Sequence, residues 1–87
     1  MTGKDMLEKA IAIVTGENVA DEGQDAEDTF VHIAQFWSDY LGFSLTDFDV
    51  CMMMVLLKVA RVKCGRSVAD SLVDIAGYAA CAIEKED

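Results

Sequence analysis

Basic residues are scarce in this chain of 87 residues, which has 7 Lys and Arg against 16 Asp and Glu and a formal net charge of −9. A chain this acidic is repelled by phosphate backbones and anionic lipids, which argues against general nucleic-acid binding and against membrane binding. The same charge favours attraction to a basic protein surface. The composition therefore points to protein partners.

Residues that carry chemistry are also few. The single histidine, His32, has no Ser, Cys or acidic partner at a useful spacing, so it is better explained as a surface or packing residue than as a catalytic base. Cys51, Cys64 and Cys81 are widely spaced and form no Cys-x-x-Cys pair, which favours reduced thiols over a disulfide or a zinc site. Because the sequence shows no signal peptide and no spanning segment, we expect a cytosolic protein.

The longest apolar stretch covers residues 46–64, and in its centre the only polar side chains are Lys58 and Arg61. Its length and its Met and Leu content favour a helix, and a helix apolar on nearly all sides must be buried on most of them. Thr46 stands three residues before Asp49, as in a capping box, and Gly65 supplies a left-handed stop. We expect this helix to be the central element.

Apolar residues recur at helical spacing in three further segments. The sequence predicts one all-α domain over residues 1–87, a compact four-helix domain with a buried third helix. Asp25 or Asp28 would cap the second helix, and the spacing of Ser67 and Asp70 suggests another capping box. Apolar residues make up 53% of the chain, more than so small a protomer easily buries, so we also expect a homo-oligomer or a partner-binding face. The helices are expected near residues 4–15, 28–41, 47–64 and 68–85.

An acidic loop is expected over residues 17–27. The segment from Glu17 to Asp28 has six acids, no base and no apolar periodicity, which is typical of an exposed connection. It is either a solvated loop or an acidic patch for a cationic protein surface or a metal ion, although its spacing does not fit a calcium-binding loop. The candidate partner-binding residues are Asp21, Glu22, Asp25, Glu27 and Asp28.

One polar cluster is expected between the last two helices. Their short connection predicts an antiparallel hairpin, which brings Lys58 and Arg61 near Asp70 and Asp74. One interpretation is an ion-pair network that fixes the hairpin register. The other is a functional site, with the two cations on an anion or the two carboxylates on a divalent metal.

Several blocks of the chain resemble a family of small tailed-phage and prophage proteins of unknown function. This resemblance implies a phage-encoded protein and brings no established activity. The blocks are Gly23, Glu27-Asp28-Thr29-Phe30, Ile33-Ala34-Gln35-Phe36-Trp37, Tyr40-Leu41-Gly42, Asp49-Val50, the run from Met52 to Arg61, and Val73-Asp74-Ile75-Ala76-Gly77-Tyr78-Ala79-Ala80.

A more remote similarity is to the all-α nucleotide pyrophosphohydrolases of the MazG type. It rests on a Lys-x-x-Arg helix followed by an Asp-rich helix, and it implies magnesium held by acidic residues on two helices. Here the central helix has no Glu, and Asp70 and Asp74 are four residues apart. These departures favour binding over catalysis.

Three functional hypotheses follow. The first is a phage accessory protein in the cytoplasm of the bacterial host, which binds a host defence or replication protein stoichiometrically through its acidic surface. The alternative is a MazG-like protein that binds or hydrolyses nucleotides, with Lys58 and Arg61 on phosphate and Asp70 and Asp74 on magnesium. The third is a structural oligomeric module of the virion or replication apparatus.

Overall fold

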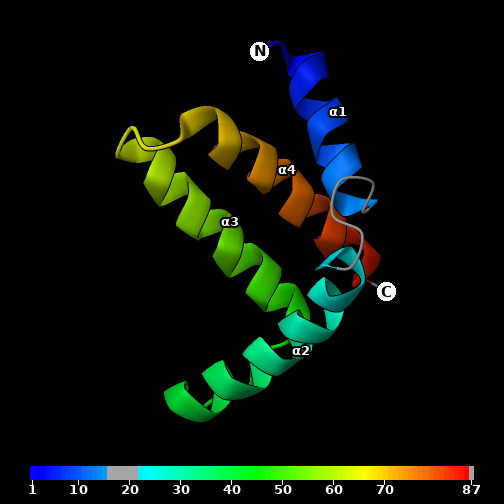
Figure 1. Cartoon of the computed structure of the whole chain (residues 1–87). Helices are drawn as coiled ribbons and strands as arrows, with labels where there is room; N and C mark the ends of the chain where they lie inside the picture. The colour runs from blue at the N-terminus through cyan, green and yellow to red at the C-terminus, as the bar shows by residue number, and fades with distance from the viewer. Residues whose placement is uncertain (16–21, 87) are drawn as a thin grey trace.

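The computed structural model describes residues 1–15 and 22–86, and for residues 22–28 it describes the backbone alone. It contains four helices, as the sequence predicts, and the all-α fold is confirmed (Figure 1). Within the described residues, none of these helices combines the length and the apolar character that crossing a bilayer would need. The helices are α1 (Gly3–Val14), α2 (Glu22–Leu41), α3 (Asp47–Lys63) and α4 (Val68–Glu84).

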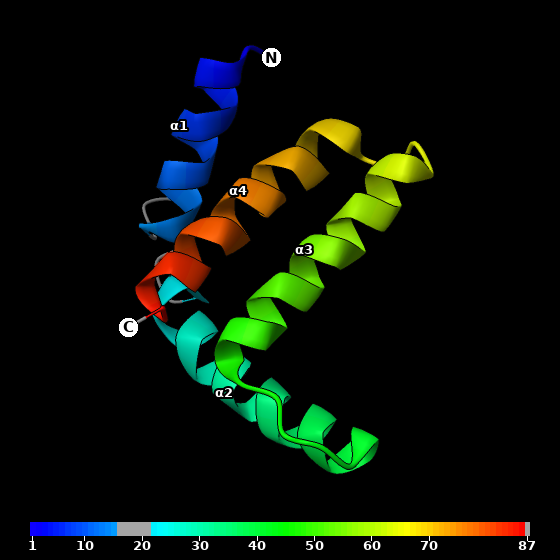
Figure 2. The same ribbon diagram turned by 180° about the vertical axis from the view of Figure 1, so that it is seen from behind.

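Helices α3 and α4 form the predicted antiparallel hairpin, joined by a short loop (Figures 1 and 2). Helix α1 packs on α4, whereas α2 crosses the hairpin at the end where α3 begins and α4 stops. The last turns of α2 project past this crossing in both views. The main cluster of buried side chains lies at this end of the hairpin, whereas Ser71 and Val73 are buried in the first half of α4.

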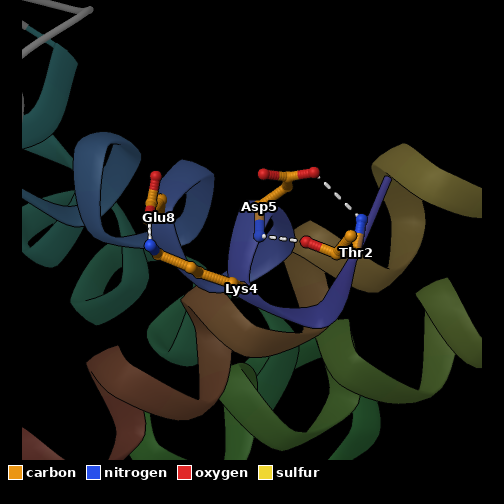
Figure 3. A network of polar contacts seen from close by, with 4 residues as sticks. All are labelled: Thr2, Lys4, Asp5 and Glu8. Carbon is orange, nitrogen blue, oxygen red and sulfur yellow. Dashed lines mark hydrogen bonds and ion pairs between the residues drawn. The ribbon is translucent and has the colours of Figure 1, made fainter.

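Capping boxes begin two of the helices. The predicted box at α3 is confirmed, because Thr46 Oγ1 accepts from the Asp49 N–H at 3.1 Å and Asp49 Oδ2 accepts from the Thr46 N–H at 2.9 Å. The same box begins α1, where Thr2 and Asp5 exchange bonds of 3.1 and 3.0 Å (Figure 3). The Thr2 backbone N–H lowers the pKa of the Asp5 carboxyl. The same Thr-x-x-Asp spacing marks the starts of both helices in the sequence.

The predicted capping box at Ser67 and Asp70 does not form. Helix α3 ends with Gly65 at φ +75°, and the Arg66 N–H donates back to the Arg61 carbonyl at 3.0 Å. This glycine-based end is the one the sequence predicts. The chain then turns again at once, which leaves Ser67 left-handed at φ 46° instead of extended, and its side chain makes no cap hydrogen bond. Two helix ends this close together leave no room for both capping geometries.

Helix α2 begins six residues earlier than predicted, so the acidic loop over residues 17–27 is too long. The second half of the predicted loop is helical from Glu22 onward. The prediction that Asp25 or Asp28 caps α2 is wrong, because both residues lie inside the helix. Glu, Gln and Ala favour helices, and carboxylates near a helix N-terminus interact well with its dipole. These local preferences outweigh the missing apolar periodicity.

The core forms where α2, α3 and α4 meet. Val50 and Cys51 of α3 are fully buried, and the aromatic rings of Trp37 and Tyr78 pack against the core from α2 and α4. Trp37 is therefore a core residue, and His32 is exposed, which agrees with its interpretation as a surface residue. The other buried members of this cluster are Phe30, Ala34 and Ala82.

The outer side of the second half of α3 is not covered within the protomer. Leu56, Leu57 and Val59 are all exposed, although the whole helix was expected to be buried on most sides. The reason is the position of its neighbours, since α2 crosses α3 near its start and α1 packs on α4. Helix α3 is thus central at its first half, and its second half contributes an exposed apolar face.

Removing the cap of α3 tests the hydrogen bonds at its start. We expect Thr46→Ala to lower the free energy of unfolding by about 1 kcal/mol, because it leaves the Asp49 N–H without its acceptor. Ser67→Ala, at the N-cap of α4, should change it by less than about 0.5 kcal/mol because Ser67 makes no such bond. Urea unfolding of both variants measures the difference. Equal losses would show that the two caps do not differ as described.

The thiol of Cys51 and the phenol of Tyr78 in the core predict that stability falls at alkaline pH. Burial raises the pKa of the Cys51 thiol and of the Tyr78 phenol. On unfolding these pKa values return to normal, so above about pH 9 the unfolded chain releases protons that the folded chain retains. We therefore expect the free energy of unfolding to fall as pH rises from 9. Tyr78→Phe should weaken this fall above pH 10, and an unchanged pH profile would contradict the role of Tyr78.

Candidate functional site

Lys58 and Asp74 form an ion pair across the hairpin. Lys58 Nζ lies 3.1 Å from Asp74 Oδ2, and the two side chains are 18% and 35% exposed. The Tyr78 phenol, one turn beyond Asp74 on α4, lies close enough to interact electrostatically with both. This partly buried contact joins the middle of α3 to the middle of α4.

The other two residues of the predicted cluster do not join this pair. Arg61 and Asp70 are both exposed, and neither forms an ion pair in the part of the chain that the structure describes. Three residues along a helix turn it by about 300°, so Arg61 points about 60° away from Lys58. The structure therefore brings together two of the four predicted residues.

A second ion pair across the hairpin was not predicted. Lys85 Nζ lies 3.3 Å from Asp47 Oδ2, and the Lys85 side chain is only 8% exposed. The same ammonium lies 6.0 Å from the centroid of the Phe30 ring, which in turn lies 5.9 Å from the Tyr78 ring. Lys85 thus links α3, α4 and α2 at the crossing.

The two ion pairs share one antiparallel register. Asp47 and Lys58 are eleven residues apart on α3, as are Asp74 and Lys85 on α4, so each helix brings its two charges to nearly the same side. This repeat was the sequence signal that could have revealed the second pair. A parallel alignment would place Asp47 opposite Asp74 and Lys58 opposite Lys85, which is repulsive. The charge order therefore favours the antiparallel hairpin.

This arrangement bears on the proposed metal and phosphate sites. Asp70 and Asp74 come from one helix, and the described residues contain no group of three or more His, Cys, Asp and Glu side chains placed to hold a metal ion. Magnesium is usually bound by one or two carboxylates together with water and substrate phosphates. With Asp74 paired to Lys58, the structure favours the register-fixing interpretation of this pair.

The acidic candidate residues lie mostly on the first turns of α2. Glu22, Asp25, Glu27 and Asp28 fall within that helix, whereas Asp21 lies outside the described residues. This end of α2 is near the C-terminal end of α4 in both views, where Glu84 and Glu86 are exposed (Figures 1 and 2). The acidic part of α2 is therefore at the opposite end of that helix from its projecting turns.

Aromatic side chains are exposed at the projecting end of α2. Tyr40 is 89% exposed and Phe36 is 73% exposed, and Phe43 just beyond the helix is also exposed. Their helical spacing from Phe30, Ile33 and Trp37 would place Tyr40 and Leu41 on the packed face of α2. They are exposed because α2 extends past the hairpin that would have covered them.

A double-mutant cycle tests the Lys58 and Asp74 pair. We expect Lys58→Met and Asp74→Asn each to lower the free energy of unfolding by about 1 to 2 kcal/mol, since each leaves a partly buried group unpaired. The double variant should lose less than the sum, with a coupling of about 1 kcal/mol. Arg61→Gln combined with Asp70→Asn is the control and should stay within about 0.5 kcal/mol of the unmodified protein. Strict additivity of the two single losses would show that the contact contributes nothing.

Two curated relatives resemble this chain, and both are bacteriophage proteins. The Gene 55 protein of Mycobacterium phage D29 is 41% identical over 76 residues, which cover 87% of this chain and 50% of the relative. The Gene 55 protein of Mycobacterium phage L5 is 41% identical over 75 residues, which cover 85% of this chain and 47% of the relative. The chain thus spans about half the length of the curated relatives that it matches.

No solved structure shows a significant match to this chain. The resemblance to small phage proteins of unknown function is confirmed by the two relatives and by a family match that covers residues 5–86. This match extends over all four helices. The chain therefore belongs to the family described as domain of unknown function 6378.

Proposed function

We propose that this chain is a phage-encoded binding protein that acts by stoichiometric association with a host protein in the bacterial cytoplasm. The observation that carries the proposal is the character of α2, which has a run of acids at its start and exposed aromatic rings at its projecting end. The exposed rings at the projecting end lie outside the core and are available to a partner.

The aromatic end supplies what a protein interface needs. Aromatic residues are enriched at interfaces and often dominate the binding energy, because a rigid ring buries much area at little entropic cost. Phe36 and Tyr40 are one turn apart on α2 and are largely exposed. They would act as anchors in an apolar depression of the partner.

The acidic stretch indicates the class of partner. Asp21, Glu22, Asp25, Glu27 and Asp28 contribute five of the acids of a chain whose net charge is −9. Such a field steers association with a positively charged surface and accelerates encounter. Proteins that bind nucleic acid have such surfaces, so a host nuclease or polymerase of a defence or replication system fits this chemistry.

The nucleotide hypothesis has less support from the geometry. It requires Lys58 for phosphate and Asp74 for magnesium, yet these two groups lie 3.1 Å apart and neutralise each other. Arg61 and Asp70 are exposed and remain available. Calorimetric titration with nucleoside triphosphates and magnesium distinguishes the hypotheses, because nucleotide binding lost in Asp74→Asn would favour the MazG-like alternative.

Neutralising the acidic stretch tests the proposed function. The variant carries Asp21→Asn, Glu22→Gln, Asp25→Asn, Glu27→Gln and Asp28→Asn. Extracts of Mycobacterium cells are a suitable source of partners, because the curated relatives come from Mycobacterium phages. We expect the tagged protein to retain a host protein at one-to-one stoichiometry, and the variant to bind it at least about tenfold more slowly. Quantitative mass spectrometry of the captured protein, followed by association kinetics, measures this.

A control variant neutralises two acids away from the start of α2, and it is compared with a variant that carries only Asp25→Asn and Asp28→Asn, so that net charge changes equally. It should retain most of the association rate, because the proposed surface is intact. Circular dichroism must show that both variants remain helical, since carboxylates also stabilise the start of α2. Equal slowing by both sets, or no captured host protein, would contradict the acidic-surface proposal. The control acids are Glu8 on α1 and Asp70 at the start of α4, which are both exposed.

A further inference from the structure

A heptad-like stripe runs along the outer side of α3. Its members are spaced alternately by four and three residues, the 3.5-residue period of a helix that packs along another helix. Leu56 lies about 160° around α3 from Lys58, which contacts α4, so the stripe faces away from the hairpin. The stripe consists of Asp49, Met53, Leu56, Ala60 and Lys63.

This stripe is left without a neighbour where it is most apolar. Leu56 is 66% exposed, Ala60 is exposed and Met53 is half-buried. Helix α2 crosses α3 near its start, and α1 packs on α4, so neither covers the second half of the stripe. A seam of this length on the surface of a small domain is typical of an interaction site.

The charges at the two ends identify the occupant. Asp49 opens the stripe and Lys63 closes it, each seven residues from Leu56. Two copies of α3 packed antiparallel around Leu56 would place Asp49 of each against Lys63 of the other. Parallel packing would instead oppose Asp49 to Asp49 and Lys63 to Lys63. The stripe is therefore complementary to itself in one orientation.

The groups at the ends are available for this contact. Asp49 uses Oδ2 to accept the Thr46 N–H, which leaves its second carboxylate oxygen for another donor. Lys63 is exposed and forms no ion pair within the described parts of the chain. In the antiparallel arrangement the large Met53 also faces the small Ala60, so the two surfaces interlock.

We infer that a second copy of this chain covers the stripe, in a two-fold homodimer with antiparallel α3 helices that meet at Leu56. This goes beyond the proposed host-protein binding, which uses α2, and either can fail alone. The dimer gives the exposed second half of α3 a packed environment. It also accounts for an apolar content of 53% in so small a chain.

Light scattering of the purified protein tests the dimer. We expect a mass about twice that of the 9.5 kDa protomer. Leu56→Asp should return the mass to one protomer while the chain stays folded, because Leu56 is mostly exposed in the protomer. Ile83→Asp is the matched control, since Ile83 is 69% exposed on α4 outside the stripe, and it should leave the dimer intact.

Lys63→Glu provides a second variant at a position that folding does not use. It should weaken the dimer about tenfold, because it opposes two carboxylates across the interface. A wild-type protein that stays monomeric at all concentrations overturns the inference. A dimer that resists both Leu56→Asp and Lys63→Glu overturns the proposed interface.

Disulfide trapping tests the orientation. Met53→Cys and Ala60→Cys are made in separate chains, each with Cys64→Ser, and the two proteins are mixed and oxidised. Antiparallel helices predict that the mixed dimer linking positions 53 and 60 dominates. Dominant self-linkage of each variant would indicate parallel helices and overturn the inferred register.

Discussion

The fold depends on the antiparallel register of α3 and α4. Two ion pairs cross the hairpin in that register, Asp47 with Lys85 at one end and Lys58 with Asp74 in the middle. The position of α2 follows from it, because the nearly buried Lys85 ammonium lies over the Phe30 ring of α2. Removing one partner of such a pair is costly because the other is left as a poorly hydrated charge. In this small chain, charge therefore positions the helices around an apolar core.

The main buried cluster lies at one end of the hairpin, and this position determines which surfaces stay exposed. The crossing of α2 covers the first half of α3 and leaves the outer side of the second half exposed, and the last turns of α2 extend past the hairpin. Two apolar surfaces result, on different helices, with different charges beside them. In our account the outer face of α3 pairs with a second copy, and α2 engages a host protein. A dimer would then present two α2 helices and could bind two partner sites at once.

Local signals predicted the fold well, and long-range geometry explains what they missed. The Thr46 cap and Gly65 stop located α3 closely, and helical spacing located α4. The start of α2 was predicted too late, because its first turns have no apolar stripe. Those turns are helical because of intrinsic helix preference and the interaction of carboxylates with the helix dipole. The helical spacing of apolar residues assigns Tyr40 to the packed face of α2. Spacing alone cannot show that α2 extends beyond the hairpin on which it packs, which leaves Tyr40 exposed. The contact between Lys58 and Asp74 was predictable from the antiparallel hairpin. The same alignment of the two helices also places Asp47 opposite Lys85, so the second ion pair could have been predicted too.

Amide hydrogen exchange along α3, followed as a function of protein concentration, tests the account most directly. We predict that residues 47–55 are protected at every concentration, because the core covers them. Residues 56–63 should exchange faster in dilute protein and become protected as concentration rises, because only a second copy covers their outer side. Equal protection of both halves at the lowest concentration would contradict the account, as it would show that the exposed face of α3 is already stabilised within one protomer.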